Sequence, residues 1–114
     1  MTRYSYLGPA GTFTERALLQ VPGADAAERI PVANVGEALR DVTEGRSDAA
    51  MIAVENSLEG VVTAAQDALA TVPGLRILSE HLVPVSFVLV APPGQAIEDA
   101  GVVVAHPVAY AQCL

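Results

Sequence analysis

The sequence predicts an α/β protein whose first part is a parallel βαβαβα unit. Residues 1–76 contain three repeats, each a short apolar strand followed by a segment of helix length, which is the pattern of βαβ units. The third predicted strand is almost entirely apolar, as expected for a strand that is covered on both faces. Two of the three predicted helices also begin with a capping box, which marks where the preceding strand has ended.

The three strands are predicted at residues 4–7, 29–32 and 49–54. The last of them reads AAMIAV and contains no polar residue. If the strands are ordered 2-1-3, which is common in open parallel sheets, the first and third strands are neighbours. The loops that follow these two strands then lie at the same edge of the sheet.

The helix starts carry a recognisable signal, in which a short polar side chain caps the first turn and an acid three residues later reaches back. Thr12 with Glu15 predicts one start, and Asn34 with Glu37 predicts the other. Gly45 is expected to end the second helix, because glycine accepts the left-handed backbone of a helix cap. The inward face of this helix is predicted to hold Val35, Ala38, Leu39 and Val42.

The third helix is predicted to begin at Glu59 or Gly60 and to continue to Ala70, with Pro73 and Gly74 closing it. Its predicted inward residues are Val61, Val62, Ala65 and Leu69.

The repeating pattern of strand and helix ends after Gly74, and we expect a second lobe to begin there. Residues 75–83 and 85–91 are expected to be extended, residues 101–105 to form a buried strand, and His106 with Pro107 to open a helix. The sequence stops at Leu114 within this helix, so the second lobe is expected to be incomplete. We therefore assign residues 1–76 to the first lobe and residues 77–114 to the start of the second.

Composition excludes several classes of protein. Apolar residues make up 52% of the sequence and charged residues 17%, which is outside the range of disordered chains. The net charge is −7 and all six cations are arginines that stand apart, which argues against nucleic acid and anionic membranes as partners. The longest apolar stretch is too short for a membrane span, no signal peptide is apparent, and the lone cysteine excludes an internal disulfide. We expect a cytoplasmic protein.

The candidate site is the edge where the first and third strands end. In an open parallel sheet, ligands bind beyond the carboxyl ends of the strands. The loops there, residues 8–12 and 55–60, are polar and marked by glycine, and each is expected to lead into a helix whose free N–H groups favour an anion. Neither loop contains an arginine, so a carboxylate would be held by backbone amides and by side chains such as Thr12, Asn56 and Ser57.

Three segments resemble a known family. Residues 6–15, YLGPAGTFTE, resemble the amino-terminal signature of prephenate dehydratases, and residues 53–62, AVENSLEGVV, resemble their central motif. AHP at residues 105–107, with AQC at residues 111–113, resembles the third. Three ordered motifs across nearly the whole chain are far more specific than any one of them.

The resemblance implies a two-lobed fold like that of type II periplasmic binding proteins, with the substrate in the cleft. It also implies a reaction without metal or cofactor, in which prephenate loses water and CO2 to become phenylpyruvate during phenylalanine biosynthesis. The catalytic residues that it implies are Glu55, Asn56 and Gln112. The substrate-binding residues that it implies are Gly11, Thr12, Phe13, Asn56, Ser57, Glu59, Gly60, His106 and Gln112.

This chain departs from the family pattern in two places and is expected to lack part of it. Many members have serine at the position of Ala105 and glutamine at that of Val108. The family's Thr-Arg-Phe motif, whose threonine is regarded as the proton donor, and its phenylalanine-binding ACT domain are not among these residues. The resemblance therefore predicts that this chain alone is inactive. It also implies a homo-oligomer, a dimer or a tetramer, for the longer protein.

Other interpretations remain open. The substrate could be arogenate, as in cyclohexadienyl dehydratases, or the chain could be a binding module that captures a small carboxylate without chemistry. Thr12 and Glu15 are explained by capping alone, and Glu55 and Glu59 more simply act separately than as an acid and base pair. His106 is more simply structural than catalytic, and Cys113 is expected to be a small buried apolar residue. Histidines and cysteines are too few for a metal site.

Overall fold

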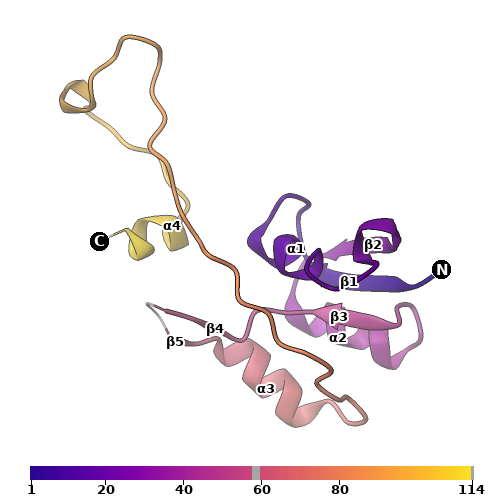
Figure 1. Ribbon diagram of the computed structural model, residues 1–114. Coiled ribbons are helices and arrows are strands. Elements are labelled where there is room, and N and C mark those ends of the chain that lie inside the picture. Colours follow the sequence, from indigo (N-terminus) through magenta and orange to yellow (C-terminus); the bar gives the residue numbers. More distant parts are fainter. Residues whose placement is uncertain (58–59, 114) are drawn as a thin grey trace. The chain divides into compact units, whose positions relative to one another are not determined.

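The protein was analysed as a computed structural model that describes residues 1–57 and 60–113. The chain forms two compact units, one comprising residues 1–83 and the other beginning at Pro84 (Figure 1). The first unit contains the sheet and three of the four described α-helices.

A parallel sheet of three strands forms the centre of the first unit, in the order β2-β1-β3. The strands are β1 (Arg3–Leu7), β2 (Glu28–Val32) and β3 (Ala49–Met51). The predicted parallel sheet and its strand order are confirmed. The third strand is shorter than predicted, because residues 52–54 follow Met51 outside the ladder with β1.

Helices cover both faces of this sheet, as the apolar third strand predicts. On one face, Tyr6 of β1 packs with Leu18 of α1 (Phe13–Leu18) and with Ala24 of the short 3₁₀ helix η1 (Ala24–Ala26). The other face carries a second cluster made by α2 (Val35–Thr43) and α3 (Thr63–Thr71). Its members are Val35, Leu39 and Ala65, packed against Ala50, Ile52, Val62, Ala68 and Leu75.

Both predicted capping boxes are present. The Glu15 N–H donates to Thr12 Oγ1 at 3.4 Å, and the Glu37 N–H donates to Asn34 Oδ1 at 2.8 Å. Each glutamate reaches back one residue further than the cap, to the N–H of the residue before it, Gly11 or Ala33. Gly45 follows α2 with φ +77°, which confirms the predicted left-handed helix end.

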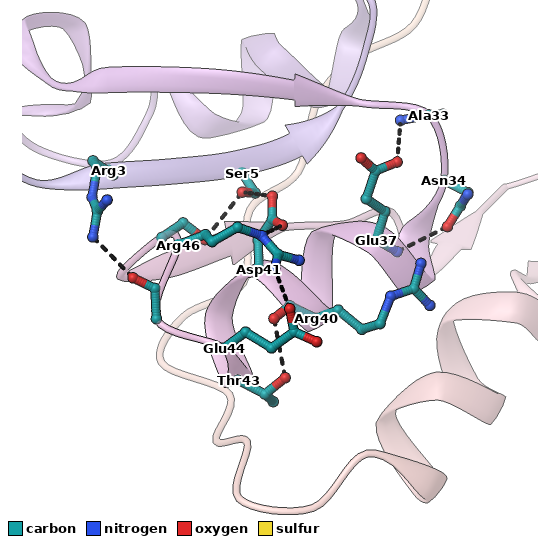
Figure 2. Close-up of polar contacts among 12 residues, drawn as sticks. Arg3, Ser5, Ala33, Asn34, Glu37, Arg40, Asp41, Thr43, Glu44 and Arg46 are labelled. Carbon is teal, nitrogen blue, oxygen red and sulfur yellow. Dashed lines mark hydrogen bonds and ion pairs between the residues drawn. The ribbon is translucent and has the colours of Figure 1, made fainter.

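A buried polar network joins α2 to β1 (Figure 2). Ser5 Oγ lies 2.8 Å from Asp41 Oδ2 and 3.0 Å from Ser47 Oγ. Arg46 Nε donates to Asp41 Oδ1 at 2.7 Å. The hydrogen bonds from Arg46 and Ser5 lower the pKa of the Asp41 carboxyl, so the residue is held as an anion against the sheet.

The prediction for the third helix is wrong at its start. Gly60, which was expected to open it, instead lies in β5 (Gly60–Val61), which pairs antiparallel with β4 (Glu55–Asn56), and the helix begins at Thr63. Gly60 has φ +76°, a left-handed conformation that does not fit inside a right-handed helix. Val61 is therefore exposed rather than inward, whereas Ala65 is buried as predicted.

The predicted strand at residues 101–105 is also wrong in the described structure. Val102 and Val104 are 83% and 95% exposed, and the segment pairs with no strand among the described residues. The runs at 75–83 and 85–91 likewise contain no paired strand. An apolar segment becomes a buried strand only when a neighbour supplies hydrogen bonds and a covering face, and the described chain supplies neither.

The second unit contains the predicted helix, α4 (Pro107–Gln112), and a short 3₁₀ helix, η2 (Ile97–Asp99). Pro107 occupies the first helical position. Proline is favoured there because the N–H group that it lacks would have no partner within the helix. Cys113 is exposed, so the prediction that it is buried is wrong. No helix in the described part of the chain is long and apolar enough to cross a membrane.

Candidate functional site

Two segments of the first unit follow neighbouring parallel strands and define the candidate site. The loop of residues 8–12 leaves the carboxyl end of β1, and the segment that contains the β4–β5 hairpin follows β3 (Figure 1). Because β1 and β3 pair directly, both segments belong to the same edge of the sheet. This is the position in which open parallel sheets bind ligands.

The first loop departs from β1 at a point of close backbone packing. The Gly8 N–H donates to the Val32 carbonyl at 2.9 Å, which ties the loop to the end of β2. A β-carbon at Gly8 would lie 2.6 Å from Pro31 Cβ, which is closer than two such atoms can approach. Gly11 adopts φ +88°, where glycine carries no steric penalty. These two glycines are therefore required by the path of the loop.

The Glu15 carboxylate contacts this loop and has three partner groups. Its Oε1 accepts the Gly11 N–H at 2.9 Å, its Oε2 accepts the Tyr6 hydroxyl at 2.8 Å, and Arg29 Nε lies 3.6 Å from Oε2. The hydrogen bond from Gly11 is the main cause of a lowered pKa at Glu15, followed by the bond from Tyr6. Burial raises the pKa of the Tyr6 phenol, and so does the neighbouring carboxylate.

Gly11 and Thr12, two residues suggested for binding a carboxylate, are hydrogen-bonded within the loop. The Gly11 N–H is bonded to Glu15, and the Thr12 hydroxyl donates to the Leu7 carbonyl at 3.3 Å. Phe13 starts α1, and its ring lies 5.4 Å from the Arg16 guanidinium carbon, within range of a cation–π contact. The loop is thus an ordered structure in which each of the three predicted site residues has a partner.

The second segment presents the residues of the predicted central motif. Glu55 and Ser57 are exposed and Asn56 is half-buried, while Asn56 and Gly60 face each other across the hairpin. Glu59 lies outside the described residues. The expectation that this loop leads directly into a helix is wrong, because β5 intervenes before α3. A helix dipole therefore does not act on this segment in the way that the sequence suggested.

Gln112 lies on α4 in the other unit and His106 precedes that helix, and their position relative to the first unit stays a prediction. His106 is exposed and caps the helix, because its Nδ1 accepts the Val108 N–H at 3.1 Å. Gln112 is half-buried in the last turn. The capping contact gives His106 a structural role.

The sequence did not predict that Tyr6 and Arg29 contribute to the candidate site. Tyr6 is 1% exposed, and a buried tyrosine hydroxyl usually requires a hydrogen-bond partner. That signal could have linked Tyr6 to the acid of the following helix start. The involvement of Arg29 could not be found in this way, because it depends on the pairing of β1 with β2.

Among residues 1–57 and 60–113, no three histidine, cysteine, aspartate or glutamate side chains are grouped so as to hold a metal ion.

Comparison with known proteins identifies the family. A family model described as prephenate dehydratase matches residues 4–114. The chain is 41% identical over 118 residues to the prephenate dehydratase of Mycobacteroides abscessus and 43% identical over 122 residues to that of Mycobacterium sp. strain KMS. Each alignment covers 98% of this chain but 38% of the relative, so the chain spans well under half the length of these proteins.

Solved structures agree with this result. The prephenate dehydratase of Arthrobacter aurescens, in complex with L-Phe, has 58% sequence identity and a TM-score of 0.74 over 86% of this chain and 32% of that one. The enzyme of Streptococcus mutans has 30% identity and a TM-score of 0.57 over 63% of this chain and 37% of that one. The chain therefore belongs to the prephenate dehydratase family.

Proposed function

We propose that this chain is the amino-terminal part of a prephenate dehydratase catalytic domain, and that it carries the substrate-orienting residues of the active site. The observation that carries the proposal is the match of residues 4–114 to the family. The two motif-bearing segments at the carboxyl ends of the paired strands β1 and β3 support it, since this is the ligand-binding edge of a parallel sheet.

The proposed reaction converts prephenate to phenylpyruvate, water and CO2. Loss of the ring carboxylate as CO2 and departure of the ring hydroxyl as water produce an aromatic ring, which drives both steps. The protein must orient a dianion, donate a proton to the leaving hydroxyl, and let the carboxylate lose its charge. The Arthrobacter relative binds L-phenylalanine, the amino acid made by transamination of phenylpyruvate, which supports a role in phenylalanine biosynthesis.

Within this reaction we assign Asn56 and Gln112 to orienting the substrate and Glu55 to supporting the site. The exposure of Glu55 and the half-burial of Asn56 at the carboxyl edge of the sheet support their access to a ligand. Substrate contacts are assigned to both segments and to α4, at Gly11, Thr12, Phe13, Ser57, Glu59, Gly60 and His106. The proton donor is assigned to residues outside this chain.

The larger assembly is also part of the proposal. We assign residues 1–76 to the first lobe and 77–114 to the start of the second lobe of a periplasmic-binding-protein-like fold. A parallel sheet with helices on both faces supports the first assignment. A dimer or tetramer, a location in the cytoplasm and independence from metals and cofactors are further expectations for the longer protein.

The function is tested by assaying the full-length protein and the 114-residue chain for phenylpyruvate formation from prephenate. The full-length protein is expected to turn over prephenate, and the chain alone to show no rate above the acid-catalysed background, because we assign the proton donor to residues outside this chain. Phenylpyruvate formation by the chain alone would refute the assignment of that donor. Full-length protein without activity on prephenate would refute the proposed substrate.

Asn56→Ala in the full-length protein tests the central motif. Losing one hydrogen bond to a buried substrate group costs about 1–3 kcal/mol, so kcat/KM is expected to fall about 10- to 100-fold. Gln66→Ala, which removes an exposed amide from α3, is the matched control and should leave kcat/KM unchanged. Equal activity of the two variants would remove Asn56 from the proposed site.

Two alternatives make different predictions in the same assays. An arogenate or cyclohexadienyl dehydratase would have the higher kcat/KM with arogenate, whose side chain carries an amino group. A non-catalytic carboxylate-binding module would bind a ligand in calorimetry but would turn over neither compound.

A further inference from the structure

One carboxylate beside the candidate site makes more contacts than its helix requires. A capping box needs the acid in the first turn only to accept a backbone N–H at the helix start. Glu15 does this through Oε1, which accepts the Gly11 N–H at 2.9 Å. Its second oxygen, Oε2, accepts the Tyr6 hydroxyl at 2.8 Å and lies 3.6 Å from Arg29 Nε.

The partners of Glu15 are themselves anchored. Tyr6 lies in β1 and is 1% exposed, within the cluster that also contains Leu18 and Ala24. Arg29 lies in β2 and donates from Nη1 to the carbonyls of Ala24 and Asp25, at 2.9 and 3.0 Å. The Glu15 side chain is 16% exposed and is therefore fixed by groups from two strands.

This arrangement gives the two carboxylate oxygens separate tasks. Oε2 accepts a hydrogen bond from Tyr6 and forms an ion pair with Arg29, whereas Oε1 accepts a hydrogen bond from the Gly11 N–H of the loop. Because a carboxylate is planar and rigid, fixing one oxygen also fixes the direction in which the other accepts. The Gly11 peptide is thereby held in a defined orientation, and Thr12 and Phe13 follow it directly in the chain.

We propose that Glu15, held by Tyr6 and Arg29, is a positioning residue that sets the orientation of the Gly11–Phe13 segment for substrate binding and turnover. This inference rests on the proposed function, because it assigns Glu15 to the same site. Misplacement of a binding group by about 1 Å can lower a rate by about 10²-fold. An acid that fixes the loop therefore affects the reaction without touching the substrate.

The chain contains a matched control for the capping role of Glu15. Glu37 occupies the same position in the second capping box, and its Oε2 accepts the Ala33 N–H at 3.2 Å. Ala33 follows β2, which lies on the side of β1 away from β3 and outside the candidate site. Glu15→Ala and Glu37→Ala therefore remove equivalent capping contacts, and only the first alters the loop after β1.

The test measures kcat, KM and thermal unfolding of the full-length protein and its variants. Glu15→Ala is expected to lower kcat/KM by about 10- to 100-fold, a range set by the rate cost of misplacement. Glu37→Ala should change kcat/KM by less than about twofold and should lower Tm less than Glu15→Ala does, because it removes a capping contact alone. Glu15→Gln should have a kcat/KM between those of wild type and Glu15→Ala, because its amide oxygen still accepts the Gly11 N–H but its amide nitrogen cannot accept from Tyr6 or pair with Arg29.

Tyr6→Phe provides a second variant that leaves Glu15 in place and removes one of its anchors. Its kcat/KM is expected to lie between those of wild type and Glu15→Ala. Equal kcat/KM values for Glu15→Ala and Glu37→Ala would overturn the proposal and leave Glu15 as a helix cap only. Equal losses in Glu15→Gln and Glu15→Ala would also overturn it, because the retained acceptor would then have no effect.

Amide hydrogen exchange at Gly11 supplies a measurement that does not depend on turnover. Exchange at Gly11 should accelerate at least about tenfold in Glu15→Ala, which corresponds to a loss of about 1.4 kcal/mol of protection or more, and should accelerate less in Glu15→Gln, whose amide oxygen can still accept the Gly11 N–H. Unchanged exchange in Glu15→Ala would overturn the positioning role. If the wild-type protein lacked activity on prephenate, the proposed function would fail, while exchange at Gly11 would still decide whether Glu15 holds the loop.

Discussion

Gly8 shows how a single residue limits the path of the chain at the candidate site. Its α-carbon packs against β2 so closely that an added β-carbon would lie 2.6 Å from Pro31 Cβ. Pro31 is part of a strand, so its position is fixed by the ladder with β1 rather than by a flexible side chain. The contact partner cannot move without disturbing the sheet.

Gly8→Ala is therefore expected to destabilise the protein by about 1–3 kcal/mol, which is the range for inserting a methyl group into a packed site. Gly101→Ala is the control, because Gly101 has an ordinary backbone conformation and no atom within 4 Å of an added β-carbon. Chemical denaturation of the full-length protein measures both changes in the free energy of unfolding. Equal stabilities of the two variants would contradict the close approach at Gly8.

At the scale of the elements, the Asp41 carboxylate joins α2 to β1 and to the segment that precedes β3. Ser5 comes from β1, Asp41 from α2 and Arg46 from the segment that precedes β3 (Figure 2). Ser47 follows Arg46 in that segment and its Oγ lies 3.0 Å from Ser5 Oγ. The Arg46 and Ser47 N–H groups also donate to the Asp41 carbonyl, at 2.8 and 3.0 Å. Asp41 is 6% exposed, and each of its carboxylate oxygens has a hydrogen-bond partner. The buried charge is therefore compensated by Arg46 and Ser5.

Asp41→Asn is expected to lower the free energy of unfolding by about 1–3 kcal/mol near neutral pH. The neutral amide loses the ion pair with Arg46, and its NH2 group cannot accept the hydrogen bond that one carboxylate oxygen accepted. Asp25→Asn, an exposed site on η1, is the control and should change stability by less than about 0.5 kcal/mol. Denaturant unfolding at pH 7 provides both values.

The difference in the free energy of unfolding between wild type and Asp41→Asn is expected to depend on pH. The pKa of Asp41 is lowered in the folded state, so its stabilising contribution is fully present above the ordinary aspartate pKa of about 3.9 and is lost as pH falls through the folded value. The stability difference between wild type and Asp41→Asn should therefore narrow below about pH 4. A difference that stayed constant to the lowest pH at which the proteins fold would contradict the lowered pKa.

At the scale of the whole molecule, the second unit exposes apolar surface. It contains a hollow of about 760 Å³ whose lining includes Phe87, Val103 and Ala109. Val88, Val90, Val102 and Val104 are all more than 80% exposed. Contiguous apolar surface of this kind favours association in water.

The 114-residue chain is therefore expected to self-associate as its concentration rises. Sedimentation velocity over a range of concentrations measures this, and Val102→Asp with Val104→Asp should shift the population toward monomer by placing charges on the exposed segment. A change of two exposed residues outside it, Thr43→Asp with Thr71→Asp, controls for added charge. Purely monomeric chain at the highest concentration would contradict the expectation.

Sequence signals of short range determined much of the first unit. The capping acids predicted the helix starts, Gly45 predicted the second helix end, and the apolar run at 49–54 predicted a covered parallel strand, of which residues 49–51 form β3. The three motifs likewise identified the family, which depends on residue type and order alone.

Only the tertiary structure decided where these signals were overridden or combined. The left-handed Gly60 and the pairing of Asn56 with it replaced an expected helical turn by a hairpin. The approach of Arg29 to Glu15 depends on β1 and β2 lying side by side, and the exposure of Val102 and Val104 depends on what packs against them. Contacts between distant residues are set by pairing and burial, which no local pattern encodes.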